Sequence, residues 1–513
     1  MSARFTLPIL LSSLLFGLVA QQAKPGATQQ TKKSTASKPS LEEEKKAAEL
    51  ESFISNAQAA PPEFSADLLL QVVESGELKD AKRRQDLIND AFYVAAKAKE
   101  RVKLMPLSGM AVDSRAGYRA TASTLGLDTL SLQSRAIKAM LPLEKQRARQ
   151  LFSDVKLNLE PLTCENTLGY DVDSFYTTIQ SIAQTGFDSE EISRGEPVFF
   201  VETYVGKITS PNQISPAIKA LLSLQTTDLQ LTTLARAVSG ALQKIPADDR
   251  SFSAPSNSTM GSIDQLVDRL RQRELSSDEV IEAYRAYLIK QLGGSRCADT
   301  ATKDQTALEN QFVIHFNSKL VASAYKKIAP ISDDEIKPAR REGVAINEPY
   351  WKSAKARSLL SQVKKLRFGS QTKELTDQQK QAAEWQSQLS ELLKELGEWT
   401  AEDEKSEEDY FHQKCVVYYA LLRTIPAGEQ YEGVVDEALR DFASLLSTSP
   451  LQKEKPAEWF LHAKVLLDRA NKAQPREREK LTNLINSLRS TVLHLYLQKP
   501  QLLKATQPRS QHE

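Results

Sequence analysis

The sequence predicts an all-α fold, either an irregular α-solenoid or a multi-helix bundle of antiparallel helix pairs. Only 19 of 513 residues are glycine, and Leu, Ala, Gln, Glu, Lys and Arg, which lose little side-chain freedom in a helix, are abundant. Apolar residues also recur at steps of three and four through most of the chain after residue 40. The one run with strand-like content, residues 198–205, is equally typical of a buried helix.

The first residues resemble a secretory signal peptide. Arg4 precedes an apolar stretch from Phe5 to Ala20, and a polar segment follows. Cleavage after Ala20 or after Ala23 is possible on this pattern. The alternative is an uncleaved membrane anchor, but the stretch is shorter than the ~20 residues that span a bilayer. We therefore expect residues 1–20 to be removed and the mature protein to be exported, periplasmic or extracellular, without a transmembrane segment.

Changes in composition divide the remaining chain. Residues 21–40 contain no aromatic or branched aliphatic side chain, so they are predicted to form a disordered low-complexity linker. Segments rich in Pro, Ser and charged residues interrupt the helical pattern twice more. The predicted parts are an N-terminal helical region (41–245), a linker (246–262), central helices (263–329), a second linker (330–350), a C-terminal helical domain (351–499) and a polar tail (500–513).

The C-terminal part is predicted to have a core of its own. All four tryptophans lie there, and large rings usually anchor packing: Trp351, Trp385, Trp399 and Trp459. An apolar seam at steps of three and four runs from Ala382 to Trp399. We expect this helix to pack in an antiparallel hairpin with residues 405–425.

Adjacent helix pairs separated by short breaks resemble tetratricopeptide and HEAT arrays in style. No fixed period of about 34 or 40 residues aligns, and the tetratricopeptide Trp-Leu-Gly-Tyr pattern is missing. Residues 135–176, RAIKAMLPLEKQRARQLFSDVKLNLEPLTCENTLGYDVDSFY, resemble exported, uncharacterised helical proteins of soil bacteria. That resemblance implies an exported, helical protein and implies no catalytic or binding residues.

Charge and motifs exclude several classes of function. The chain has 67 basic and 66 acidic residues, a net charge of +1, which argues against a nucleic-acid binder that depends on bulk charge. Nucleophile-elbow, zinc-protease, P-loop and dinucleotide-binding motifs are absent from the sequence. No catalytic residue, no cofactor and no nucleic-acid partner are therefore predicted.

One spacing is compatible with a metal site. Glu408, His412 and Cys415 follow each other at i, i+4 and i+7, so a helix places them on one face. Carboxylate, imidazole and thiolate all bind zinc, and three protein ligands leave one position for water. The favoured alternative is a packed helix face with His412 at its border, made by Phe411, Cys415, Val416, Tyr419 and Leu422.

The sequence contains three cysteines. Cys164 and Cys297 occur in loop-like contexts, whereas Cys415 lies in an apolar helical run. In an oxidising compartment we expect a Cys164–Cys297 disulfide and a buried free thiol at Cys415. The alternative is three reduced cysteines.

These observations favour a non-enzymatic protein-interaction or scaffold module of the cell envelope, with a protein partner there. Helical arrays offer long surfaces for partners, and we expect a groove lined by aromatic and apolar side chains. The alternative is an exported helical lyase or hydrolase acting on envelope polymers, with Glu408 and His412 as acid and base. The sequence does not indicate the oligomeric state.

Overall fold

The computed structural model describes most of the chain after residue 40. The described residues are 41–98, 103–105, 114–157, 159–163, 168–170, 172–247, 249–253, 258–294, 296–297, 310–336, 341–342, 353–369, 373–426 and 428–503. The predicted signal peptide (1–20) and disordered linker (21–40) lie outside them, as does the predicted tail beyond residue 503.

Helices dominate the described residues, which confirms the predicted all-α class. In the N-terminal and central parts they are α1 (Leu41–Gln58), α2 (Pro62–Ser75), α3 (Ala81–Ala95), α4 (Ser114–Arg119), α5 (Thr121–Thr124), α6 (Thr129–Met140), α7 (Lys145–Ser153), α8 (Val172–Thr185), α9 (Ser189–Ser193), α10 (Glu196–Val205), α11 (Pro211–Leu222), α12 (Asp228–Lys244), α13 (Thr259–Gln272), α14 (Asp278–Leu292) and α16 (Val321–Ser323). In the C-terminal part they are α17 (Ala354–Phe368), α18 (Asp377–Lys380), α19 (Ala383–Glu398), α20 (Glu407–Leu422), α21 (Glu432–Thr448), α22 (Leu451–Glu454), α23 (Pro456–Lys472), α24 (Pro475–Ser487) and α25 (Thr491–Leu502).

Strands are minor in the described residues. Two antiparallel two-residue strands, β1 (Lys103–Leu104) and β2 (Leu168–Gly169), pair with each other. A parallel pair joins β3 (Arg296–Cys297) and β4 (Arg341–Glu342). No helix within the described ranges is long and apolar enough to cross a membrane.

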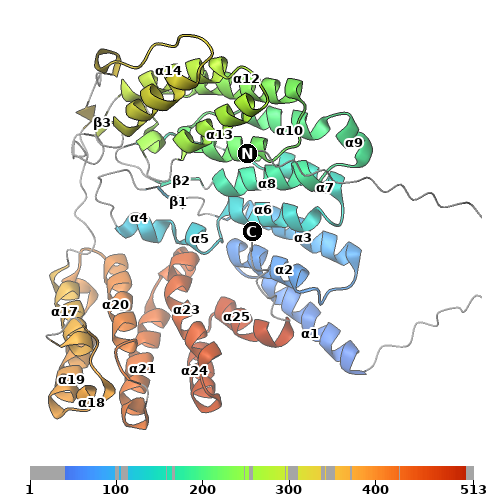
Figure 1. The fold of residues 1–513 in the computed structure, drawn as a ribbon. Helices are drawn as coiled ribbons and strands as arrows, with labels where there is room; N and C mark the ends of the chain where they lie inside the picture. The colour runs from blue at the N-terminus through green and yellow to red at the C-terminus, as the bar shows by residue number, and fades with distance from the viewer. Residues whose placement is uncertain are drawn as a thin grey trace, which may run out of the picture. The chain divides into compact units, whose positions relative to one another are not determined.

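From α6 to α14 the helices stack as pairs. Contacting pairs are α6/α7, α8/α10 and α11/α12, and α13 and α14 follow as the next two helices of the chain. Their first helices contact one another in sequence (α6, α8, α11, α13), and α10, α12 and α14 form a second row (Figure 1). Each pair contacts its neighbours in the chain, which is the arrangement of an α-solenoid.

Buried side chains follow the helical period that the sequence predicts. In α3 the residues Leu87, Ile88 and Phe92 are buried along one face. The run at 198–205 forms most of α10, with Val198, Val201 and Val205 buried. Steps of three and four place these valines on one side of a helix, whereas a strand would bury alternate residues.

The seam in α19 has a different partner from the predicted one. Trp385, Leu389 and Leu396 are buried as expected. The helix packs mainly along α17, and Nε1 of Trp385 donates to the carbonyl oxygen of Leu366 at 2.8 Å. Helix α17 itself packs on α20. The predicted hairpin with 405–425 is therefore wrong, because α17 offers its own apolar face to the seam.

The described residues from 48 onward form one compact unit. Phe64 of α2 meets Phe460 of α23 edge-on, with ring centroids 4.9 Å apart. Near this contact the hydroxyl of Tyr496 in α25 donates to Asp67 of α2. Helices from the two ends of this unit therefore share a core. The division at 246–262 and 330–350 into separate parts stays a prediction.

We predict that Phe460→Ala lowers the free energy of unfolding by about 3–5 kcal/mol, because it removes a buried ring from this shared core. The matched control is Phe199→Ala, whose side chain is 62% exposed and whose loss should cost less than about 0.5 kcal/mol. Urea unfolding followed by circular dichroism measures both. Equal midpoints for the two variants would contradict the shared core.

Candidate functional site

Helix α20 carries the residues singled out in the sequence. Ser406 caps it by accepting a hydrogen bond from the backbone N–H of Asp409 at 3.0 Å. Acidic side chains occupy its first turn, where their negative charge is stabilised by the positive end of the helix dipole. Buried residues point in most directions around α20, so it is a central helix with neighbours on several sides, among them α17 and α21.

A chain of hydrogen bonds joins α20 to α23. Nε2 of His412 lies 3.1 Å from Oε2 of Glu458. Nδ1 of His412 lies 2.8 Å from Nε2 of His462, and Nδ1 of His462 lies 2.6 Å from the hydroxyl of Tyr419. The side chains of His412 and Glu458 are each 1% exposed. We call Glu458, His412, His462 and Tyr419 the histidine network.

Two members of the histidine network have strongly shifted pKa values. Burial lowers the pKa of His462 well below its usual value, and the neighbouring His412 lowers it further. Burial raises the pKa of Tyr419 well above its usual value. Tyr419 therefore keeps its proton and His462 stays neutral, and in one arrangement that satisfies every contact Tyr419 donates to Nδ1 of His462. His462 then donates from Nε2 to His412, and His412 donates from Nε2 to the carboxylate of Glu458.

An aromatic ring from α4 covers this network. Tyr118 stacks on His412 with ring centroids 3.8 Å apart and planes 8° from parallel. Burial raises the pKa of Tyr118 to about 12. A hollow of about 440 Å³ lies beside the network, and Tyr118, Tyr419 and His462 border it while His412 does not. The Tyr419 end of the network, its outer end, therefore reaches this hollow, whereas the Glu458 end, its inner end, does not.

A second carboxylate and a lysine adjoin the inner end. Nζ of Lys455 lies 2.7 and 2.8 Å from the two carboxylate oxygens of Glu408 and 3.9 Å from Oε1 of Glu458. One ligand atom from each of Glu408, His412 and Glu458 lies within 4.8 Å of the others, a grouping that could hold a metal ion. We call these three residues the carboxylate–imidazole cluster.

The structure thus brings together two of the three predicted metal ligands. Glu408 and His412 lie in the cluster, but Cys415 does not. Cys415 is a buried free cysteine, as expected, and burial raises the pKa of its thiol well above the usual value. The third member, Glu458, was missed by the sequence analysis. A signal existed: Glu458 and His462 repeat in α23 the i, i+4 spacing of Glu408 and His412 in α20.

The predicted disulfide concerns residues at the edge of what the structure describes. Cys164 lies outside the described residues, and of Cys297 only the backbone is described, in β3. The Cys164–Cys297 pair therefore stays a prediction.

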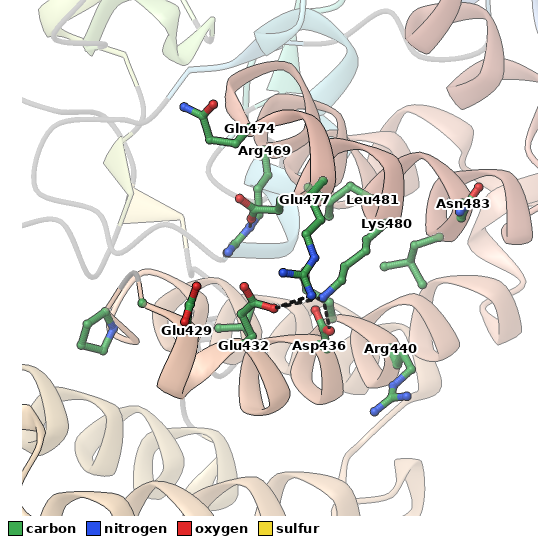
Figure 2. Close-up of a pocket in the computed structure, with 16 residues that line it drawn as sticks. Glu429, Glu432, Asp436, Arg440, Arg469, Gln474, Glu477, Lys480, Leu481 and Asn483 are labelled. Carbon is green, nitrogen blue, oxygen red and sulfur yellow. Dashed lines mark hydrogen bonds and ion pairs between the residues drawn. The ribbon is translucent and has the colours of Figure 1, made fainter.

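A larger depression lies between α21 and α24, and we call it the α21–α24 groove. Its volume is about 720 Å³ (Figure 2). Apolar side chains contribute to its lining: Val435, Leu439, Leu481 and Leu484. No aromatic residue is among the lining residues described, so the expectation of an aromatic lining is wrong for this groove.

Ion pairs join the two walls of the groove. Nζ of Lys480 lies 2.7 Å from Asp436 and 3.5 Å from Glu432. Two further charges lie at opposite ends of the groove: Glu429, just before α21, and Arg440, near the middle of α21 (Figure 2). Both are exposed, and neither has an ion pair within the described part of the chain. The groove therefore combines an apolar lining with an unpaired acid at one end and an unpaired base at the other.

Comparisons with models of protein families, with curated proteins and with solved structures found no match to this chain.

We predict that the buried imidazole of His462 makes stability depend on pH. The unfolded chain binds a proton at this residue below about pH 6.5, whereas the folded protein, with its lowered pKa, does not. The contribution of His462 to the free energy of unfolding is therefore complete above about pH 6.5. It falls by up to ~1.4 kcal/mol per pH unit as the pH drops below that value. Titrations of unfolding between pH 5 and 8 should show a shallower slope for His462→Gln. The control His494→Gln removes an exposed ring and should keep the wild-type slope.

Proposed function

We propose that this chain is an exported, non-enzymatic protein-interaction module that holds one short segment of a partner protein in the α21–α24 groove. The observation that carries the proposal is the groove itself: an apolar lining between two helices, with unpaired charges of opposite sign at its ends. The expected occupant has apolar side chains at its centre, an acidic residue placed near Arg440 and a basic residue placed near Glu429.

The size of the groove favours a short segment. A volume of about 720 Å³ lies within the roughly 300–1,000 Å³ that is typical of sites that enclose a small ligand. The apolar lining residues are one turn apart on each helix, Val435 and Leu439 on α21 and Leu481 and Leu484 on α24. Side chains at such spacing match the anchors of an amphipathic segment that lies along a helix-lined groove.

The ion pairs across the groove do not oppose such an occupant strongly. Glu432, Asp436 and Lys480 are each about 40% exposed in their side chains. Exposed ion pairs contribute only about 0–1 kcal/mol each. A partner segment can therefore exchange its own charges with these side chains at low cost, and the apolar contacts supply most of the affinity.

Electrostatics would set the direction of the segment more than its affinity. Because Glu429 and Arg440 lack ion pairs within the described residues, a segment that brings charges of the opposite sign loses no existing pair at either end. The reversed segment would place like charges together at both ends. Complementary charge at a rim discriminates between such orientations.

The enzymatic alternative receives less support from the geometry. A general acid or base must come within about 2.6–3.2 Å of the substrate atom that it protonates or deprotonates. His412 and Glu458 are almost fully buried, and Tyr118 covers the imidazole of His412. His462 and Tyr419 do reach the neighbouring hollow, but their pKa values are shifted away from neutrality in the directions that keep both side chains uncharged.

We predict that peptide-display selection against the protein enriches segments with an apolar centre, an acid at one flank and a base at the other. Arg440→Glu should invert the preference at the acidic flank, so that basic residues are enriched there. The control Lys364→Glu changes an exposed charge on α17 and should leave the selected sequences unchanged. Enrichment of the same sequences by wild type and Arg440→Glu, or no enrichment at all, would overturn the proposal.

Export is a separate part of the proposal and has its own test. If residues 1–20 act as a signal peptide, the mature protein begins at Gln21 or, with the later cleavage, at Lys24. Mass spectrometry of the N-terminal peptide, recovered from envelope and culture fractions, measures this. An intact Phe5–Ala20 stretch in all recovered protein would contradict cleavage.

A further inference from the structure

We propose that Glu408, His412 and Glu458 form a binding site for a divalent transition-metal ion, with zinc as the first candidate, and that the ion takes the place of the Lys455 ammonium group. This site lies on α20 and α23 and is independent of the α21–α24 groove. It therefore adds a second binding activity to the proposed interaction function.

The cluster already has nearly the spacing that a metal requires. Zinc binds imidazole nitrogen and carboxylate oxygen at about 2.0–2.2 Å, so tetrahedral ligand atoms are separated by roughly 3.3 Å. Nε2 of His412 and Oε2 of Glu458 lie 3.1 Å apart. The Glu408 carboxylate completes the group within 4.8 Å and is only partly buried, so a small rotation brings it into range.

The histidine network supplies the outer contacts that a metal-bound imidazole needs. When Nε2 of a histidine binds a metal, Nδ1 carries the proton and donates it to a neighbouring acceptor. Here Nδ1 of His412 faces Nε2 of His462, and Nδ1 of His462 faces the hydroxyl of Tyr419. If both imidazoles change tautomer, His412 donates to His462 and His462 donates to the Tyr419 oxygen. Each ring keeps one proton throughout, so this rearrangement releases none.

Charge balance favours a divalent ion at this position. Glu408 and Glu458 carry two negative charges when ionised, and Lys455 supplies one positive charge, so these three side chains together carry a net charge of −1. A divalent ion in place of the ammonium group brings the net charge to zero. The Lys455 side chain is 32% exposed, so it can turn into solvent and open the route by which the ion enters.

The donor set selects the kind of metal. Two carboxylates and one imidazole suit zinc and similar transition-metal ions, whereas magnesium prefers sites built from oxygen atoms and water. Three protein ligands leave a fourth position, on the side where Glu408 and Lys455 meet solvent. Tyr118 covers one face of the His412 ring.

The test is isothermal titration of the untagged full chain with ZnCl₂, with MgCl₂ as a second titrant. We expect one zinc ion per chain and no heat from magnesium. Glu408→Gln, on the exposed side of the cluster, should weaken zinc binding at least ~10-fold, the loss that removal of an outer-shell partner alone can cause. His412→Gln should weaken it similarly, and His494→Gln, on the exposed face of α25, should not change it.

Lys455→Gln distinguishes a metal site from an ordinary ion pair. If zinc competes with the ammonium group, this variant binds zinc more tightly than the wild type. If Lys455 only neutralises the carboxylates, the variant is less stable and binds zinc no better, which overturns the exchange of the ammonium group for the ion. Failure of both wild type and Lys455→Gln to bind one zinc ion, or equal affinity in wild type and Glu408→Gln, overturns the proposal. Neither outcome bears on the peptide selection, which probes a different part of the chain.

Discussion

The need to satisfy ionisable side chains inside an apolar core governs the centre of this structure. A buried carboxylate or imidazole without partners costs several kcal/mol, so such groups persist only where hydrogen bonds and opposite charges surround them. Glu458 and His412 meet this requirement through each other, through His462 and Tyr419, and through Lys455 at the margin. These hydrogen bonds consequently fix the position of α20 along α23. Tyr118 of α4 adds its ring to the same contact.

The two candidate sites differ in how a ligand can enter them. In the histidine network nearly every polar contact is internal and shielded from water, so a ligand gains access only by replacing a resident group. In the α21–α24 groove the polar contacts lie at the surface, and Val435 and Leu484 are partly exposed above the buried Leu439 and Leu481, so a partner can add to what is present. The first arrangement suits a small ion with strong, directional bonds, and the second suits a flexible chain that gains many weak contacts.

Helical periodicity in the sequence was sufficient to predict the fold class, because burial on one face repeats locally along the chain. It left residues 198–205 open between a strand and a buried helix, and the structure shows the helix. It did not predict that the α19 seam meets α17, since any complementary apolar face satisfies such a seam. Partners that come from distant helices could likewise not be predicted for the carboxylate–imidazole cluster. Glu408 and His412 share a helix and could be paired from their spacing, but Glu458 follows His412 by 46 residues and Tyr118 comes from a distant helix. Contacts of that kind depend on the tertiary path of the chain.

The contact between α2 and α25 has a consequence for the order in which the protein matures. Asp67 and Tyr496 are 429 residues apart, and Phe64 beside Asp67 packs against a ring of α23. A chain that emerges from a ribosome or a membrane channel with its N-terminus first exposes this part of α2 until almost the whole polypeptide has followed. The surface of α2 around Phe64 is thus open to aggregation or to a holding chaperone for nearly the full time of synthesis or transport, although α3 and α6 can cover the rest of the helix early. Completion of the native core is tied to the arrival of its last helices.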